Sequence, residues 1–299
     1  MTRILITGAN GFLGSNLVRI LLSNNYKILA FSRSTNNISE YLHLIDFANI
    51  SSKTYNDYKD KIIKFQPNII LHFAWDGGNN HSDINLLKQL QSNIPEGLSL
   101  LEIINCLRVK PVFFGVGSFS EYGIKNKKIT EVDELSPVNF YGLSKKVFKE
   151  ISEMFCLQNQ ISWRWIRPCF VYGPNDVKTR LIPSTVYKLR NNIDITLDSC
   201  NTLIDYIYID DFCTAIIGLI ETNSYGVFNI CSGNEYILKD IVLFLQKNIK
   251  STSKITFDRT LDSKISTRYI CGSNEKIKNT INWSPKIKLE AGLLLVSQK

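Results

Sequence analysis

Three regularly spaced glycines near the start of the chain constrain the fold more than any other feature. They lie between the short apolar run 3–6, which is typical of a buried strand, and the segment 13–22, whose apolar residues share one helical face. In such a strand-to-helix turn, glycine permits a tight bend and lets the backbone approach a pyrophosphate at the helix start. We expect this turn to contact a dinucleotide through Gly8, Asn10, Gly11, Phe12, Leu13 and Gly14.

Short apolar runs and helical segments alternate through about residue 166. Strands are expected near residues 3–7, 27–31, 42–45, 69–73, 111–116 and 162–166, with helices between them. This alternation favours a doubly wound parallel α/β sheet. Further along the chain, helices are expected among short strands at residues 181–190, 241–249 and 289–296.

The composition indicates a globular protein with reduced thiols. The chain has 299 residues, 44% of them hydrophobic, and no apolar run approaches 18 residues, so we expect a large core and no membrane partner. Seven cysteines without a Cys-x-x-Cys pair and three scattered histidines predict neither disulfides nor a metal site. Because the chain opens on a strand rather than a signal sequence, we expect a cytoplasmic protein. The net charge of +8 comes from dispersed residues without a nucleic-acid-binding motif, which argues against a nucleic-acid partner.

A tyrosine and a lysine one helical turn apart form the candidate catalytic pair. Tyr141 and Lys145 open a segment that is expected to be helical through about residue 157, and Ser118 follows the buried strand 111–116. Positions i and i+4 are neighbours on a helix, so the ammonium favours the phenolate. Moving a tyrosine pKa from about 10 to about 7 takes about 4 kcal/mol of differential stabilisation. With Ser118 hydrogen-bonded to the substrate oxygen, the three groups predict a hydride-transfer site.

A second tyrosine and lysine, Tyr55 and Lys59, have the same spacing. Neither an upstream buried strand nor a hydroxyl residue accompanies them. We therefore interpret Tyr55 as a residue of an exposed helix face.

The end of the second strand indicates the cofactor. NAD enzymes usually place an acidic residue there for the ribose hydroxyls, whereas the 2′-phosphate of NADP needs a cation. Residues 30–34 contain no acid, so we expect NADP(H) to be preferred over NAD(H). Ser32, Arg33 and Ser34 are expected at the cofactor, with the planar guanidinium of Arg33 on the 2′-phosphate. The alternative is a solvated arginine in a surface loop.

Taken together, these residues resemble the extended short-chain dehydrogenase/reductase family of nucleotide-sugar epimerases, dehydratases and reductases. The resemblance runs nearly end to end and is also carried by the segments 72–74, 117–123, 167–174, 205–211 and 282–285. It implies further cofactor contacts from Asp46 and Phe47, which follow the expected third strand, and from His72, Phe73, Ala74 and Pro168. Tyr141 and Lys145 are also expected at the cofactor, with Lys145 holding the nicotinamide ribose.

The resemblance also implies a division of the chain and a substrate. The NADP-binding Rossmann domain would comprise residues 1–168 and about 203–222, and a smaller mixed α/β substrate lobe would comprise 169–202 and 223–299. A nucleotide-diphosphate sugar is the implied partner, and a homodimer the implied assembly. Substrate contacts are expected from Ser118, Phe119, Ser120, Tyr141, Phe170, Arg180 and Lys264. Because Phe170 replaces the family asparagine, we expect Arg180 or Lys264 to supply phosphate recognition, although either could be a solvated surface charge.

The residues after Ser118 separate the reactions of the family. Its 4,6-dehydratases carry a carboxylate at the position of Ser120, whereas Glu121 stands one place late. Its epimerase-reductases carry a cysteine there and a histidine after the segment 172–174, and this chain lacks both. The resemblance therefore implies an NADPH-dependent reductase of a nucleotide-linked 4-keto-6-deoxy sugar. The alternatives are a nucleotide-sugar C4 epimerase with tightly bound NAD and a redox-sensing NADP-binding protein.

Overall fold

The chain divides into two compact units. The computed structural model describes residues 1–76, 89–262 and 269–298. The first unit comprises Met1–Gly123, Glu134–Arg167 and Ile216–Phe228, and the second comprises Ile124–Asp133, Pro168–Ala215 and Asn229–Lys299. This division differs from the expected one at 124–133, which joins the second unit because the backbone of Ile129 is hydrogen-bonded to Cys271 and Ser273. It differs again at the return to the first unit, which begins at residue 216 rather than 203.

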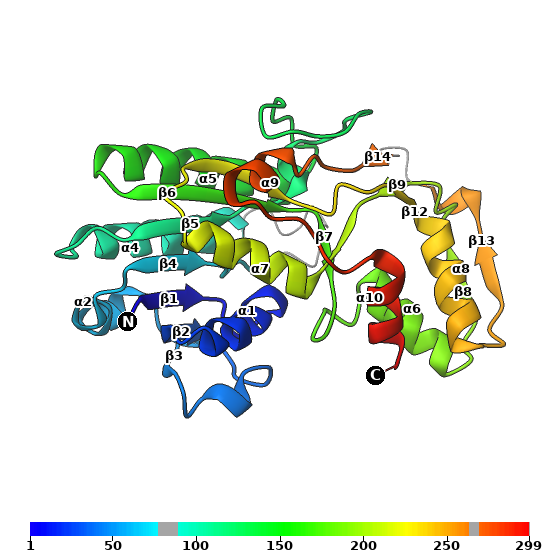
Figure 1. Ribbon diagram of the computed structural model, residues 1–299, viewed down its shortest axis with the longest axis horizontal. Coiled ribbons are helices and arrows are strands. Elements are labelled where there is room, and N and C mark those ends of the chain that lie inside the picture. The colour runs from blue at the N-terminus through cyan, green and yellow to red at the C-terminus, as the bar shows by residue number, and fades with distance from the viewer. Residues whose placement is uncertain (77–88, 263–268, 299) are drawn as a thin grey trace. The chain divides into compact units, whose positions relative to one another are not determined.

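The first unit is built on a seven-stranded sheet of order β11-β6-β5-β4-β1-β2-β3 (Figure 1). Adjacent strands from β3 through β6 pair in parallel, which confirms the expected doubly wound sheet. The strand order reverses between β1 and β4, where sheets of this kind bind ligands beyond the carboxyl ends of the strands. The strands are β1 (Arg3–Thr7), β2 (Lys27–Ser32), β3 (Asp46–Asn49), β4 (Ile69–His72), β5 (Val112–Val116), β6 (Ser162–Pro168) and β11 (Gly226–Ile230).

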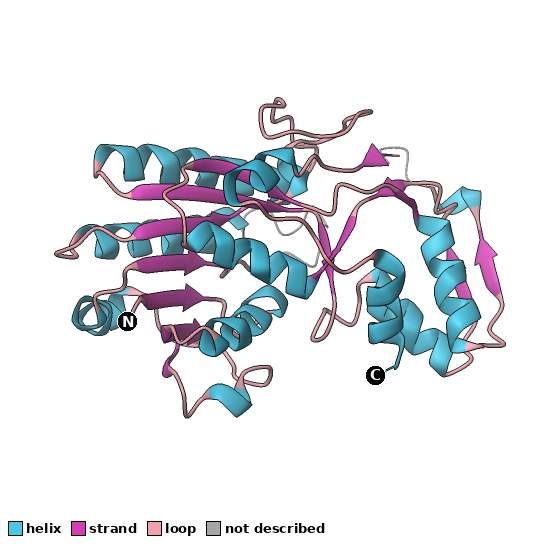
Figure 2. Ribbon diagram, in the orientation of Figure 1, coloured by secondary structure: helices cyan, strands magenta, loops and turns pink. Residues whose placement is uncertain are grey.

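Helices cover the faces of this sheet (Figure 2). The α-helices are α1 (Phe12–Ser23), α2 (Lys59–Phe65), α4 (Ile94–Asn105), α5 (Phe140–Gln158) and α7 (Ile209–Ile220), the last of which continues from the second unit into the first. The shorter helical turns are η1 (Ser39–Tyr41), η2 (Asn56–Tyr58), the π-helical η4 (Gln89–Asn93) and η5 (Phe119–Glu121). None of the described helices is both long and apolar enough to cross a membrane.

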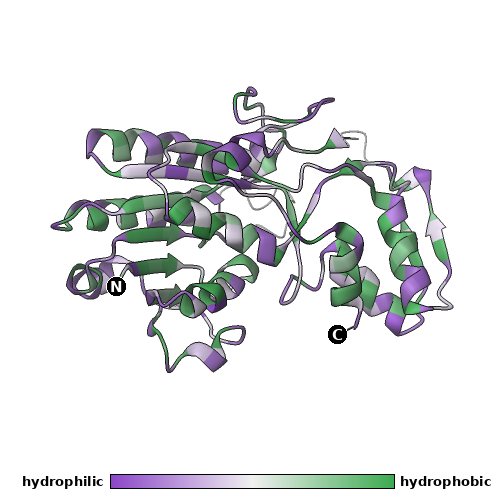
Figure 3. Cartoon of the chain, in the orientation of Figure 1, coloured by the Kyte–Doolittle hydropathy of each residue, from purple (hydrophilic) through white to green (hydrophobic). Residues whose placement is uncertain are grey.

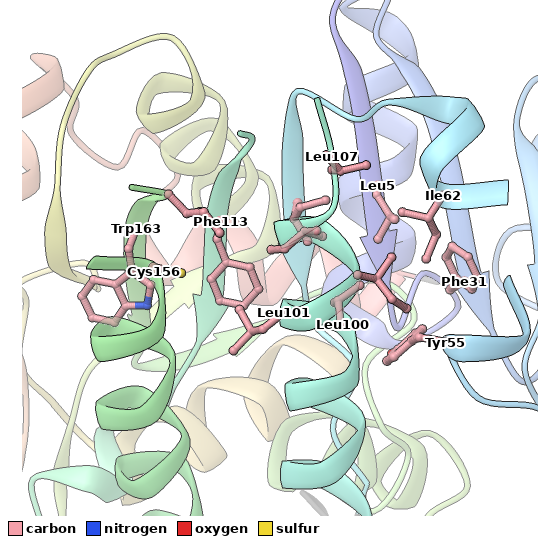
Figure 4. Close-up of a cluster of buried hydrophobic side chains, with 14 of the residues drawn as sticks. Leu5, Phe31, Tyr55, Ile62, Leu100, Leu101, Leu107, Phe113, Cys156 and Trp163 are labelled. Carbon is pink, nitrogen blue, oxygen red and sulfur yellow. The ribbon is translucent and has the colours of Figure 1, made fainter. Parts of the chain in front are cut away.

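The core of the first unit lies between the sheet and the helices α2, α4 and α5. Leu5 of β1 and Phe113 of β5 pack in one buried cluster with Ile62 of α2, Leu101 of α4 and Trp163 of β6 (Figure 4). The central strands β1 and β4 are correspondingly apolar along their length (Figure 3). Burial of each large side chain contributes about 1.5–3 kcal/mol. This packing fixes the carboxyl ends of the strands, where the candidate site lies.

The third strand begins later than expected. Residues 42–45 form a turn, and β3 spans Asp46–Asn49. The first residue of β3 pairs with Leu29 and the last with Ser32, the end of β2. The expectation that Asp46 follows the strand is therefore wrong, because Asp46 opens it. Pairing with β2, rather than the local apolar run, sets where the strand begins.

The second unit combines small sheets with helices. Pairing joins β7 to β10, β9 to β12 and β14, and β8 to β13. Its strands are β7 (Phe170–Tyr172), β8 (Ile195–Leu197), β9 (Leu203–Ile204), β10 (Tyr206–Tyr208), β12 (Tyr236–Ile237), β13 (Ile255–Phe257) and β14 (Tyr269–Ile270). Its helices are α6 (Leu181–Arg190), α8 (Leu238–Ile249), α9 (Glu275–Ile281), α10 (Leu289–Gln298) and the short turn η6 (Arg259–Leu261).

Candidate active site

The glycine-rich turn connects β1 to α1 at the carboxyl edge of the sheet. Gly8 has a φ of +68°, and a Cβ atom there would lie 2.7 Å from the backbone nitrogen of Ala74. Only glycine suits both this conformation and this close approach. Helix α1 begins after Gly11, and no side chain in the described residues caps it. Backbone that lies this close to β4, at a helix start without a side-chain cap, fits the pyrophosphate of a dinucleotide.

The other expected cofactor residues border the same turn. Asn10 donates a hydrogen bond to Ser34 at 2.7 Å and accepts one from the backbone of Asn37. Arg33, just past the end of β2, has a 63% exposed side chain and lies 3.4 Å from a carboxylate oxygen of Asp76. Ser32 is the buried last residue of β2. The guanidinium of Arg33 is thus held at the surface beside the end of β2.

The end of β4 packs against the turn through Thr7. The Thr7 hydroxyl lies 2.9 Å from Nδ1 of His72 and accepts a hydrogen bond from the backbone N–H of Ala74. The backbone N–H of Phe73 donates to the Thr7 carbonyl oxygen. Burial and the nearby Lys145 ammonium lower the pKa of His72 to about 3, so this histidine is a neutral packing residue.

Four further residues expected at the cofactor lie in α1, β3 and β6. Phe12 is buried and Leu13 is half-buried in the first turn of α1. Phe47 is the half-buried second residue of β3. Pro168, the last residue of β6, is half-buried.

Ser118 opens the short helical turn η5 directly after β5. Its hydroxyl accepts a hydrogen bond from the backbone N–H of Ser120 at 3.1 Å, and its own N–H donates to Glu121 at 2.8 Å. This reciprocal capping box fixes the backbone of Ser118. Phe119, between the two serines, is buried.

Glu121 belongs to a fully buried ion pair. Its carboxylate accepts hydrogen bonds from Arg167 Nε at 2.9 Å and from the indole N–H of Trp165 at 3.0 Å. Burial lowers the pKa of Arg167, but the charge of Glu121 and the hydroxyl of Tyr122 outweigh it and raise that pKa. The Glu121 side chain is 0% exposed, so its carboxylate is fully buried.

Tyr141 and Lys145 lie in the first turns of α5, which packs against η5. Asn139 caps the helix by accepting the Gly142 N–H at 2.8 Å. A Cβ atom at Gly142 would lie 2.3 Å from the carbonyl oxygen of Ser120, so glycine lets the helix start touch the turn that carries Ser118. The Lys145 ammonium lies 5.8 Å from the centre of the Tyr141 ring. The fold thus brings together the elements that carry the three predicted catalytic residues.

Lys145 is buried at the carboxyl end of β5. Its ammonium donates a hydrogen bond to the Val116 carbonyl oxygen at 2.7 Å, and it lies 3.8 Å from the centre of the Trp75 ring. Burial lowers the pKa of Lys145 to about 7, against the opposing effect of Glu121. The lysine therefore exchanges its proton near neutral pH.

The second tyrosine–lysine pair is differently placed. Tyr55 is 2% exposed and packs edge-on against Phe31, with ring centres 5.7 Å apart. The interpretation of Tyr55 as an exposed helix residue is therefore wrong. Burial raises the pKa of its hydroxyl, and Lys59 is exposed, so this pair cannot exchange protons with a ligand at the surface.

The expected substrate residues of the second unit occupy one region around β7 and α6. Phe170 opens β7, is 39% exposed and packs against Tyr206. Arg180 precedes α6 and lies 3.2 Å from Asp176, a carboxylate whose pKa burial raises to about 6. The expected residue Lys264 lies outside the described residues.

The sequence did not identify Trp75 or Gln89 as part of the site. The indole N–H of Trp75 donates to Gln89 at 2.6 Å, and Asn93 donates to the same oxygen at 3.1 Å. Its position in the sequence could have identified Trp75, because it directly follows the segment 72–74.

Comparison with known proteins agrees with the fold. The model of the NAD dependent epimerase/dehydratase family matches residues 4–231. The chain belongs to this family. It is an NAD(P)-dependent oxidoreductase of the extended short-chain dehydrogenase/reductase type.

Individual relatives match nearly the full length. The chain is 27% identical to CDP-abequose synthase of Salmonella muenchen and 23% identical to dTDP-4-dehydro-6-deoxyglucose reductase of Escherichia coli, covering in each case 97% of this chain and 95% of the relative. Among solved structures, UDP-glucose 4-epimerase of Thermotoga maritima aligns with a TM-score of 0.90 at 22% identity, covering 99% of this chain and 98% of the other. That structural match supports the fold.

Proposed function

We propose that this enzyme uses NADPH to reduce the keto group of a nucleotide-linked 4-keto-6-deoxy sugar. The burial of Glu121 carries the proposal. A dehydratase needs a carboxylate free to take a proton from the sugar, but Glu121 is held by Arg167 and Trp165. Ser120 and Phe119 offer no acid or base in its place. Hydride delivery with proton donation from Tyr141 is the chemistry that the remaining groups support.

The proposed reaction assigns one task to each catalytic side chain. A reduced nicotinamide cofactor, bound at the glycine-rich turn, would supply the hydride for the keto carbon. Tyr141 donates its hydroxyl proton to the carbonyl oxygen, and Ser118 donates a hydrogen bond to the same oxygen. The Lys145 ammonium stabilises the phenolate that Tyr141 leaves behind. The product is the nucleotide-linked 6-deoxy sugar with a hydroxyl group at C4.

The relatives support the substrate class. CDP-abequose synthase and dTDP-4-dehydro-6-deoxyglucose reductase carry names that denote nucleotide-linked deoxysugars. In this chain, we propose that Arg180, held by Asp176, binds the diphosphate and that the exposed ring of Phe170 contacts the nucleotide or sugar. Asn49, rather than Asp46, is proposed to border the adenine, because it ends β3 beside Ser32.

A substrate panel tests the proposed reaction. The protein is incubated with NADPH and CDP-, GDP-, dTDP- and UDP-linked 4-keto-6-deoxy sugars while absorbance of the reduced nicotinamide is followed. We expect stoichiometric loss of NADPH with at least one sugar. No oxidation with any sugar, together with NAD that copurifies tightly, would instead support the C4 epimerase.

Replacing Arg33 with alanine tests the cofactor preference. A charged hydrogen bond contributes about 1.5–3 kcal/mol, so we expect the Kd for NADPH to rise about 10- to 100-fold. The Kd for NADH should change by less than about threefold, since NADH lacks the 2′-phosphate. Both constants can be measured by nicotinamide fluorescence, with Arg108→Ala, at an exposed arginine before β5, as the control. Equal losses for both cofactors would defeat the proposal.

A further inference from the structure

Lys145 has an aromatic partner that the catalytic triad does not explain. Its ammonium lies 3.8 Å from the centre of the Trp75 ring, well within the range of a cation–π interaction. The lysine is 3% exposed, and its other close partner among the described residues is the Val116 carbonyl oxygen at 2.7 Å. In a site that excludes water, an aromatic face can favour a cation by a factor of about 30.

The indole ring is fixed by a polar clamp rather than by chance packing. Its N–H donates to Gln89 Oε1 at 2.6 Å, and the Gln89 amide donates in turn to the Asp76 carbonyl oxygen at 2.9 Å. Asn93 completes the clamp, because it accepts the Asp76 N–H at 2.7 Å and donates to the Asp76 carbonyl oxygen at 3.0 Å. Both amide residues are buried.

The clamp lies in a π-helical turn and reaches the catalytic helix. Gln89–Asn93 forms η4, a conformation that occurs frequently at functional sites. Ser144, the neighbour of Lys145, lies 3.4 Å from the same Gln89 oxygen. Residues of η4 and α5 therefore meet at the Gln89 oxygen that holds the Trp75 ring.

The titratable groups near Lys145 do not all favour its charged form. Glu121 from η5 favours the charged lysine, and its own partner is Arg167 of β6. His72 of β4 is neutral, and the ammonium lies 5.8 Å from the centre of the Tyr141 ring of α5. Burial opposes the charge most strongly. The neutral, electron-rich face of Trp75 lies close enough to the ammonium to offset the effect of burial on its charge.

We propose that Trp75 is a positioning residue of the active site, whose indole face, clamped by Gln89 and Asn93, holds the Lys145 ammonium beside Tyr141. The role of Lys145 in the reaction rests on the proposed function, but its contact with the Trp75 ring does not. A test of this contact that needs no substrate therefore distinguishes a failure of the proposal from a failure of the proposed function.

Tryptophan fluorescence against pH provides that test. In the wild-type protein, the emission of Trp75 is expected to change with a midpoint near neutral pH as Lys145 loses its proton. Trp75→Phe and Lys145→Met should both abolish this transition, whereas the control Trp283→Phe, at a tryptophan of the second unit, should retain it. A transition that survives in Lys145→Met, or no transition in the wild type, would overturn the proposal.

Kinetics with an accepted sugar give the second arm. Trp75→Leu removes the aromatic face and is expected to lower kcat about 30-fold, whereas Trp75→Phe keeps a face and should lose less. Because only the protonated lysine stabilises the Tyr141 phenolate, the alkaline fall in kcat should move to lower pH by about 1.5 units in Trp75→Leu. An unshifted pH profile in Trp75→Leu, with thermal unfolding as in the wild type, would overturn the proposal. If no sugar is reduced by any variant, the proposed function fails while the fluorescence arm still decides the contact.

Discussion

Replacing Tyr141 with phenylalanine is expected to lower kcat for sugar reduction by about 10²- to 10⁴-fold. The substitution removes the hydroxyl that is the proposed proton donor and retains the ring near Lys145. Because the hydroxyl is needed in the transition state rather than for binding, the Kd for NADPH should stay within about twofold. Stopped-flow and steady-state absorbance of NADPH measure the rate, and nicotinamide fluorescence measures the binding.

Tyr55 supplies the matched control for this substitution, since it has the same spacing to a lysine. Tyr55→Phe should leave kcat unchanged and lower the free energy of unfolding by about 1 kcal/mol, because its hydroxyl is hydrogen-bonded to Thr7 in the core. A rate loss in Tyr55→Phe equal to that in Tyr141→Phe would contradict the assignment of the proton donor. So would a Tyr141→Phe enzyme that retains most of its kcat.

Local sequence patterns were sufficient for the elements that carry strong periodicity. The long helix after Tyr141 and the buried strand before Ser118 have the expected bounds to within one or two residues. The third strand was misplaced because its residues carry little hydrophobic signal of their own. Its position follows from pairing with β2, which the local sequence does not contain.

The candidate site divides in the same way. The motif residues could be predicted because each chemical role demands a residue type at a fixed spacing, as in the i, i+4 relation of Tyr141 and Lys145. Trp75 was not found because its partner Lys145 is 70 positions away and meets it only after β4 and β5 pair. The spacing after Ser118 set Glu121 aside as misplaced for dehydration, but it did not predict the partner Arg167, which the pairing of β5 with β6 brings beside it.

Arg167→Met is expected to lower the free energy of unfolding by about 3–5 kcal/mol. Arg167 and Glu121 are 1% and 0% exposed, so removing the cation leaves a buried carboxylate without its compensating charge. The substitution also removes the hydrogen bond to the Tyr122 hydroxyl at 2.8 Å. Urea unfolding followed by circular dichroism measures the loss. Lys278→Met, which breaks an exposed pair with Glu275, should cost less than about 1 kcal/mol and serves as the control.

The double variant Glu121→Gln/Arg167→Met separates the charge from the shape of this pair. A buried ion pair can be replaced by neutral residues of similar volume with little change in stability, so the double variant should recover most of what Arg167→Met loses. Its kcat should nevertheless be lower than that of the wild type, because the neutral amide no longer favours the charged form of Lys145. A double variant as unstable as Arg167→Met would show that packing, rather than an unpaired charge, causes the loss. Restored stability with lowered kcat would place the pair in the support of the catalytic residues as well as in the core.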